Sequence, residues 1–402
     1  MYLSLQCTAF FKYHMLADGT PSTTEDLGGT GALDGHETCD IVEFNFSWGY
    51  LLMATGKGDF GDRIERALFN AGMGAVRNDW SGLQYISCPN QLHIARNSCQ
   101  VGHVGTAAAL YGPNSDHRPE FKFVTSCCAG NVNRMVPHYV QRMWMNADKG
   151  GLAAVLYGPS RVRALAGERD HPVEIIEETS YPFSERIIFH ILCGHPVSFP
   201  LHLRIPIWCE HPRLSINGKS IPLPPMENGF IVLNRTHAND DTIILDVPMR
   251  VAMGHSSDSG IFLERGPLLY SLNPQEDWDP IMMPEFEITS PDYFPMWGAT
   301  ARSPWNYAVA IDENASLDKQ IYVYQKLVDV DAWSNPSIRL KVPARRIRGW
   351  GLLHPKGDDP DWFRTPPLSS EKNDLGAMEM ITLVPLGSTQ LRLTVFPSAS
   401  SG

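Results

Sequence analysis

The sequence predicts a multidomain α+β protein, and two observations support this fold class. Segments before Asp148 carry apolar side chains at helical spacing, whereas the residues after it form short runs of strand-like pattern. A chain of 402 residues is also long enough for two or three domains. We therefore expect a helical part that is followed by antiparallel β-sheets.

The helical part is predicted to contain three clear helices. The first covers about 40–55 and ends at Gly56, and the second covers about 59–71 after a short glycine-rich connection. A connection this short predicts an antiparallel helical hairpin. A third helix is expected at about 132–145, where Pro137 kinks it or sets its first turn apart.

The β region is predicted to form two domains. Residues 149–255 contain several short strand-like runs that are separated by turn signals such as Asn217-Gly218, which predicts an antiparallel β-sandwich. Residues 256–379 continue as a second β-rich domain with many prolines and tryptophans. The strand-like runs in 380–400 are expected to return and complete the first sandwich.

The composition excludes several classes of protein. Hydrophobic residues make up 43% of the chain and charged residues 19%, so a sizeable core is expected. The net charge of −11 and the lack of a basic tract argue against nucleic acid and anionic membranes as partners. No apolar stretch reaches transmembrane length, and Met1 to Leu16 does not have the pattern of a signal peptide, which favours a cytoplasmic location.

A candidate metal site lies in two short stretches of the helical part. Glu37 and Cys39 are expected on a turn before the first helix, because two-residue spacing on a helix would point them to different sides. Cys127 and Cys128 precede the third helix, and one carboxylate with three thiols fits a tetrahedral Zn²⁺ set. The alternative is that these cysteines are buried and pack as small hydrophobic side chains.

Three blocks of the helical part occur in a defined order: Glu37-Thr38-Cys39, Glu65-Arg66-Ala67-Leu68-Phe69-Asn70, and Cys127-Cys128 followed by Asn131 and Arg134. With these blocks the chain resembles glycoside hydrolase family 127, the β-L-arabinofuranosidases with a zinc-bound cysteine nucleophile. The resemblance runs from about His14 to Pro397 through further blocks: Leu203-Arg204-Ile205-Pro206-Ile207-Trp208, Glu264-Arg265-Gly266-Pro267-Leu268-Leu269-Tyr270, Ser303-Pro304-Trp305-Asn306-Tyr307-Ala308, Val342-Pro343-Ala344-Arg345 and Gly387-Ser388-Thr389-Gln390-Leu391-Arg392.

The resemblance implies a retaining glycosidase that binds Zn²⁺. Its nucleophile would be Cys127, while Cys128, Cys39 and Glu37 complete the set of zinc ligands. Zinc would keep the thiol deprotonated at neutral pH and allow the sulfur to leave again. The implied substrate is an L-arabinofuranoside or a related glycan.

The resemblance also assigns a general acid/base and two pocket residues. Glu25 matches the acid/base, although by itself it reads as a solvated acid in the glycine-rich stretch 10–36, with Asp26 as a local rival. Glu65 and Tyr85 match substrate-binding positions. The alternatives are a surface carboxylate paired with a neighbouring arginine for Glu65, and ordinary packing for Tyr85.

Members of the family have an (α/α)6 barrel of six helical hairpins as their catalytic domain. Residues 1–148 are enough for the C-terminal part of such a barrel, so the chain resembles the family without the N-terminal part. Two other functions remain open. One is a non-catalytic carbohydrate-binding or scaffolding protein with a structural zinc, and the other is redox chemistry at Cys127-Cys128. Formation of a homo-oligomer is also left open.

Overall fold

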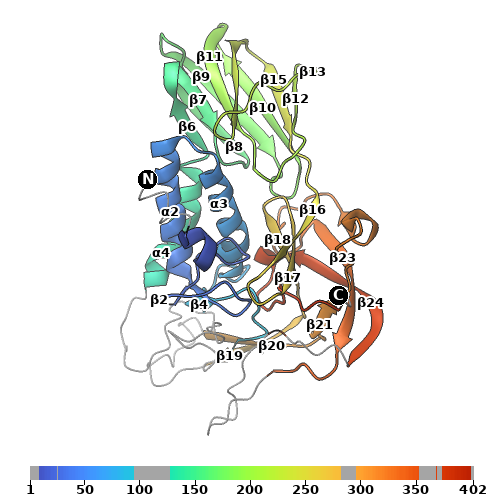
Figure 1. The fold of residues 1–402 in the computed structure, drawn as a ribbon. Coiled ribbons are helices and arrows are strands. Elements are labelled where there is room, and N and C mark those ends of the chain that lie inside the picture. The colour runs from blue at the N-terminus through green and yellow to red at the C-terminus, as the bar shows by residue number, and fades with distance from the viewer. Residues whose placement is uncertain are drawn as a thin grey trace. The chain divides into compact units, whose positions relative to one another are not determined.

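The computed structural model describes the chain over residues 9–24, 26–94, 127–281, 296–352, 368 and 374–399 (Figure 1). The chain forms two compact units, each made of separate segments. The first unit comprises Met1–Phe44, Arg66–Met135 and Val251–Gly402, and the second comprises Asn45–Glu65 and Val136–Arg250. Each unit therefore takes residues from both the helical part and the β part of the sequence. The predicted three-domain division stays a prediction.

Three α-helices agree with the predicted ones, with shifted ends. Helix α2 is Thr38–Thr55, α3 is Asp59–Ala67 and α4 is Cys127–Val140, which contains Pro137. Helix α2 is followed by Gly56, whose φ of +65° is a left-handed conformation that suits glycine. Helix α4 begins at the cysteine pair itself, earlier than predicted. Among the described residues, no helix is long and apolar enough to cross a membrane.

The turn that follows α3 departs from α-helical geometry. Residues Leu68–Gly72 form a π-helix, and all five are buried. Such insertions often occur at functional positions. Here the Asn70 amide donates to the Pro267 carbonyl over 2.9 Å and accepts from Leu269 N over 2.7 Å. Asn70 thus joins this turn to the strands of the first unit.

The second unit contains two sheets. A six-stranded sheet has the order β13-β12-β15-β10-β9-β8, and a four-stranded sheet has the order β14-β11-β7-β6. The ring of Trp144 in β6 meets that of Phe189 in β10 edge to face at 5.8 Å, so the two sheets are in contact. The strands are β6 Trp144–Ala147, β7 Gly151–Ala154, β8 Ser160–Ala166, β9 His171–Thr179, β10 Arg186–Cys193, β11 Val197–Arg204, β12 Arg213–Ile216, β13 Lys219–Ile221, β14 Phe230–His237 and β15 Asp241–Asp246.

The first unit contains a sheet in the order β16-β17-β18-β24-β23-β21, with β22 also paired to β23. Strand β24 pairs with β18 and β23. The expectation that 380–400 completes the first sandwich is therefore wrong. Leu383 of β24 lies opposite Leu272 and Leu340, and all three are buried in this unit. The strands are β16 Val251–His255, β17 Ile261–Arg265, β18 Leu268–Leu272, β21 Tyr307–Val309, β22 Tyr322–Gln325, β23 Ile338–Ile347 and β24 Leu375–Pro385.

Two smaller sheets complete the first unit. Strands β19 (Glu276–Ile281), β20 (Met296–Ala301) and β5 (His93–Ile94) form one of them. The other has the order β2-β1-β3-β4, with the strands β1 Thr23–Thr24, β2 Asp26–Leu27, β3 His36–Glu37 and β4 Ile86–Ser87. The glycine-rich stretch 10–36 thus contributes to three short strands, and β3 leads directly into α2.

Candidate metal centre

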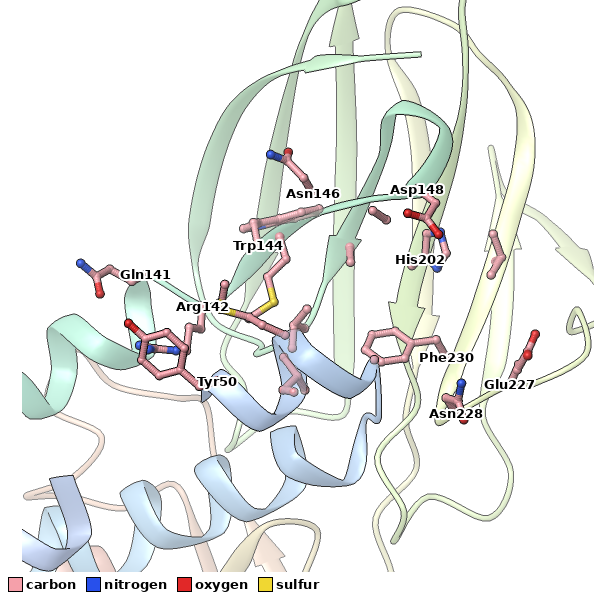
Figure 2. Close-up of a pocket in the computed structure, with 18 residues that line it drawn as sticks. Tyr50, Gln141, Arg142, Trp144, Asn146, Asp148, His202, Glu227, Asn228 and Phe230 are labelled. Atoms are coloured by element: carbon pink, nitrogen blue, oxygen red, sulfur yellow. The ribbon is translucent and has the colours of Figure 1, made fainter. Parts of the chain in front are cut away.

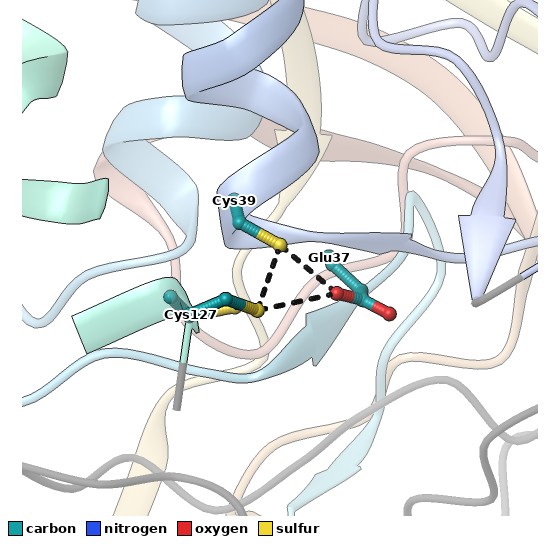
Figure 3. A group of neighbouring side chains, drawn as sticks. Glu37, Cys39 and Cys127 are labelled. Carbon is teal, nitrogen blue, oxygen red and sulfur yellow. Dashed lines mark hydrogen bonds between the residues drawn. The ribbon is translucent and has the colours of Figure 1, made fainter. Parts of the chain in front are cut away.

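Four side chains converge at the start of α2 and α4. Glu37 ends β3, Cys39 lies in the first turn of α2, and Cys127 and Cys128 are the first residues of α4. Their potential ligand atoms all lie within 4.8 Å of one another. Figure 3 shows the side chains of Glu37, Cys39 and Cys127 pointing toward a common centre.

Local hydrogen bonds hold Glu37 and Cys39 in this position. The Asp40 carboxylate accepts from Glu37 N over 3.1 Å, a bond from the third helical residue back to the residue that caps the helix. Thr38 N donates to the Tyr85 carbonyl over 3.0 Å, and the Thr38 hydroxyl donates to the Gln84 carbonyl over 2.6 Å. The start of α2 is thereby fixed to the chain segment that enters β4.

Two distances within the cluster match those of a tetrahedral metal ion. With Zn–S bonds of about 2.3 Å, two sulfur ligands lie about 3.8 Å apart. Cys127 Sγ is 3.9 Å from Cys128 Sγ and 3.8 Å from Glu37 Oε2. Cys39 Sγ makes shorter contacts, 3.2 Å to Cys127 Sγ and 2.9 Å to Glu37 Oε2. Three thiols and one carboxylate form a donor set that favours zinc over magnesium or calcium.

The electrostatics of the cluster distinguish one thiol from the others. Hydrogen bonds with Cys128 and Cys39 lower the pKa of the Cys127 thiol, while the bond with Cys127 raises the pKa of Cys39 and of Cys128. Burial raises the pKa of Glu37 to about 7. Among the described residues, no ion pair supplies a cation to this group. Without a cation, Glu37, Cys39 and Cys128 therefore favour their protonated forms, and a bound cation would favour the charged forms that act as metal ligands.

Cys127 also differs from its neighbours in exposure. It is exposed, whereas Glu37 and Cys128 are buried. A thiol at the rim of a cluster is accessible to a molecule that approaches from solvent. The structure thus places a thiol of lowered pKa at the accessible side of the candidate metal centre, which is the position that a nucleophile requires.

The structure brings Tyr85 into direct contact with this cluster. The Tyr85 hydroxyl donates to Glu37 Oε1 over 3.1 Å, and the residue is 3% exposed. The bond orients the Glu37 carboxylate, so Tyr85 does more than pack in the core. Glu25 lies outside the described residues. Asp26, its rival, lies in β2 and is exposed.

Glu65 has a different setting, in the second unit. Its carboxylate forms an ion pair with the buried Arg204 and accepts hydrogen bonds from the hydroxyls of Tyr181 and Tyr139. Tyr157 N also donates to it, over 3.2 Å. The side chain is 0% exposed, so the surface pairing that the sequence left open for Glu65 is wrong.

Several supporting residues were missed at the level of sequence. His36 Nε2 is 2.9 Å from Asp18 Oδ2, and both side chains are buried beside β3. Asn90 accepts from the backbone of Thr394 and Val395, while the Arg392 guanidinium donates to the carbonyls of Cys88 and Gly74. The C-terminal segment thus holds the chain on both sides of β4. Arg392 had a signal in the sequence, because it is a charged residue between Leu391 and Leu393.

Together the fold and the cluster define a multidomain α+β protein with a candidate metal centre of one carboxylate and three thiols. Residues 18–141 match the family model described as the GH127 catalytic domain of β-L-arabinofuranosidase, and residues 151–249 match the GH127 middle domain. These matches cover more than half of the chain. The chain belongs to glycoside hydrolase family 127.

Similar proteins include enzymes named as β-L-arabinofuranosidases. The non-reducing end β-L-arabinofuranosidase of Bifidobacterium longum subsp. longum is 23% identical over 257 residues, which cover 60% of this chain and 37% of that protein. A GH127 β-L-arabinofuranosidase from Geobacillus stearothermophilus T6 has a TM-score of 0.64 at 18% identity, covering 96% of this chain and 53% of that chain. A second GH127 β-arabinofuranosidase structure gives 0.67 at 16% identity, with coverages of 97% and 55%. The chain spans about half of these structures and less of the curated relative, and the structures show the shared fold.

Proposed function

We propose that this chain carries the site of a retaining glycoside hydrolase of the β-L-arabinofuranosidase type, with Cys127 as the nucleophile and Glu25 as the general acid/base. The observation that carries the proposal is the exposed Cys127 thiol of lowered pKa, set among Glu37, Cys39 and Cys128. The matched catalytic-domain model supports the assignment. The name of the Bifidobacterium relative supports an L-arabinofuranoside as substrate.

Each residue has a defined task in this reaction. In the first step, Cys127 Sγ forms a bond to the anomeric carbon as the glycosidic C–O bond breaks, and Glu25 gives its proton to the departing oxygen. In the second step, water attacks the same carbon, the C–S bond breaks, and the Glu25 carboxylate takes a proton from the water. Two inversions retain the configuration.

The metal proposed for this site is Zn²⁺, held by Glu37, Cys39, Cys127 and Cys128. When bound, it would keep these thiols deprotonated and make the Cys127 sulfur a better leaving group. Tyr85 orients the Glu37 carboxylate through its hydroxyl. Glu65 and Tyr85 are proposed to support sugar binding, Tyr85 beside the cluster and Glu65 through the polar network of the second unit.

The finer fold assignment is also a proposal. We assign residues 1–148 to the C-terminal part of an (α/α)6 barrel, and 149–255 and 256–379 to two β-sandwich domains. In support, the matched catalytic and middle domains fall on either side of this first boundary. The Trp144–Phe189 contact between the two sheets also fits a sandwich.

A second function is favoured by the number of ligands. Four protein ligands fill a tetrahedral site completely, which is typical of structural zinc rather than catalytic zinc. In this alternative the protein binds carbohydrate, or serves as a scaffold, without turnover. The two functions predict the same metal content and differ in whether Cys127 forms a covalent bond to sugar.

The test combines elemental analysis with turnover of an aryl β-L-arabinofuranoside by the purified chain. We expect about one zinc per chain, turnover in the wild-type protein, and a glycosylated Cys127 peptide in rapidly quenched samples by mass spectrometry. Cys127→Ala should abolish both signals, whereas Cys88→Ala, which removes a buried thiol outside the cluster, should retain them. Equal turnover by Cys127→Ala would refute the proposal. Bound zinc and bound sugar without turnover would favour the structural alternative.

A further inference from the structure

The second unit contains a cavity of about 940 Å³ between the end of α2, the residues after α4 and the strands β6, β7, β11 and β14 (Figure 2). All of its lining residues belong to the second unit, whereas the four residues of the candidate metal centre belong to the first. The cavity is large enough for one or two sugar rings. It therefore needs an explanation of its own.

Arg142 lines this cavity in an unusual position for a charged side chain. It is 6% exposed, and its guanidinium carbon lies 5.2 Å from the ring centre of Phe46 and 5.4 Å from that of Tyr50. A Cβ at Gly49 would come within 1.9 Å of Arg142 Nε, so only glycine leaves room for the guanidinium there. Two aromatic rings and a glycine thus hold the cation in place.

The Arg142 charge has no acidic partner among the described residues. Its guanidinium donates from Nη1 to the His138 carbonyl over 3.1 Å, and Nε is buried without a hydrogen-bond partner. Burial lowers the pKa of Arg142, and no carboxylate opposes this effect. A buried cation of this kind is costly unless an anion accompanies it. The cavity therefore presents a preorganised cation that lacks its anion.

The remaining lining suits a sugar. Tyr50, Trp144 and Phe230 offer aromatic surface, and Trp144 and Tyr50 are accessible from the cavity. Side chains with amide groups, which donate and accept hydrogen bonds, also line it: Gln141, Asn146 and Asn228. Figure 2 shows Arg142 beside Tyr50 at one end of the cavity and Asp148 beside His202 at the other. An anionic group is thus favoured at the Arg142 end only.

We propose that this cavity is a second carbohydrate site, which binds a sugar acid with its carboxylate on the Arg142 guanidinium. A hexuronate has the required parts: a carboxylate for the planar donor group of Arg142, a ring face for Tyr50 or Trp144, and hydroxyls for the amide side chains. The step is binding only, without chemistry. Binding of the sugar acid does not depend on Cys127 or on zinc. It can therefore be tested separately from the proposed hydrolase activity.

The test is calorimetric or NMR titration of the purified chain with D-glucuronate and D-galacturonate. Their methyl esters, which have the same rings without the charge, are the matched ligands. We expect the free acids to bind about tenfold or more tightly than the esters, because a charge-assisted bond to Arg142 is lost. Arg142→Gln should remove this preference. Arg186→Gln, which removes an exposed arginine of the same unit, should leave it unchanged.

Three results would overturn the proposal. These are equal binding of acid and ester, a preference that survives in Arg142→Gln, and no binding of either acid at millimolar concentration. If Arg142→Gln does not fold, as judged by circular dichroism, the comparison of acid with ester on the wild-type protein still tests the proposal. Equal binding of the two would then overturn it.

Discussion

Glu37 and Glu65 are two buried glutamates of the helical part, and they differ in the charged partners of their carboxylates. Both accept a hydrogen bond from a buried tyrosine hydroxyl, Glu37 from Tyr85 and Glu65 from Tyr181. Glu65 also has a permanent cation, the fully buried Arg204. Glu37 has three thiols around it, and among the described residues no ion pair reaches it.

The two acids differ in whether the protein itself supplies a cation that pairs with them. In the second unit, Arg204 also forms an ion pair with Asp62 at 2.5 Å, so its charge is satisfied within the protein. Around Glu37 the hydrogen bonds from Cys39 and Tyr85 offset only part of the desolvation, and burial raises its pKa to about 7. One carboxylate and three thiols that the fold brings together without an ion-paired cation form a site where a bound cation would favour the charged forms of these groups. This is the physical reason to place the metal at Glu37.

The largest effect is expected from removal of the built-in cation. Arg204→Met leaves Glu65 and Asp62 without their partner in a buried site, which should lower the free energy of unfolding by about 3–5 kcal/mol. Urea unfolding measures this loss. Arg186→Gln, whose exposed ion pair with Asp246 is worth no more than about 1 kcal/mol, is the control. Similar losses in both variants would contradict the role assigned to Arg204.

A smaller effect is expected when the proposed metal is removed. Zinc at about a hundred times its dissociation constant should stabilise the native state by about 2.7 kcal/mol. We expect a chelator to lower the melting temperature of the wild-type protein and to leave Cys39→Ser unaffected. Cys88→Ser, which alters a buried thiol outside the cluster, should respond as the wild type does. A chelator response that persists in Cys39→Ser would show that the metal lies elsewhere.

Loss of the hydrogen bond from Tyr85 should have a more modest effect, which is on the affinity for the metal. Tyr85→Phe removes the donor that orients Glu37, and loss of such a partner typically weakens metal binding about 10- to 100-fold. This corresponds to about 1.4–2.7 kcal/mol. Competition with a zinc indicator measures the affinity. Tyr322→Phe changes an exposed tyrosine of the same unit and should have no effect; equal affinities in all three proteins would exclude a supporting role for Tyr85.

Glu177 shows a third way to bury an acid, which is to keep its proton. Burial raises its pKa to about 8, and it accepts bonds from Gly158 N and the Ser160 hydroxyl. Because the folded pKa exceeds the unfolded value of about 4.5, the folded state holds more protons between these values. Its contribution to stability therefore falls as pH rises from about 4.5 to 8, by at most about 1.4 kcal/mol per pH unit.

The comparison of Glu177→Gln with the wild type isolates this effect. Unfolding experiments between pH 5 and pH 9 should show that the difference in stability between the two proteins changes up to about pH 8 and is constant above it. Glu168→Gln, which alters an exposed glutamate of the same unit, should give a difference that lacks this dependence. A constant difference for Glu177→Gln would mean that Glu177 is charged in the folded protein.

The sequence was most informative where the relevant contacts are local. Glu37 and Cys39 lie at the start of one helix and Cys127 and Cys128 at the start of another, so two short stretches were enough to predict the cluster. The partners of Glu65 could not be predicted in this way. Tyr181 lies 116 residues further along the chain, and nothing in a helical Glu-Arg pattern indicates it. The acid/base role of Glu25 stays a prediction.

The same limit applies to the C-terminal strands and to Arg142. An alternating apolar pattern fits any sheet, so the residues of β24 did not reveal that their neighbours are β18 and β23. The buried position of Arg142 depends on Gly49, which as a lone glycine in a helix looks only like a weak point. Both features follow from packing between distant segments, which a single sequence does not display.

The bonds between Asn90 and the C-terminal segment have a consequence for how the protein is made. Asn90 and Thr394 are 304 residues apart, so the segment that carries Tyr85 gains its support only after almost all of this chain has been synthesised. Until then the four side chains of the candidate metal centre lack this support, and contacts of such long range form slowly. The order of biosynthesis therefore favours a protein that folds around the cluster late, with its thiols open to oxidation or to the wrong metal on the ribosome.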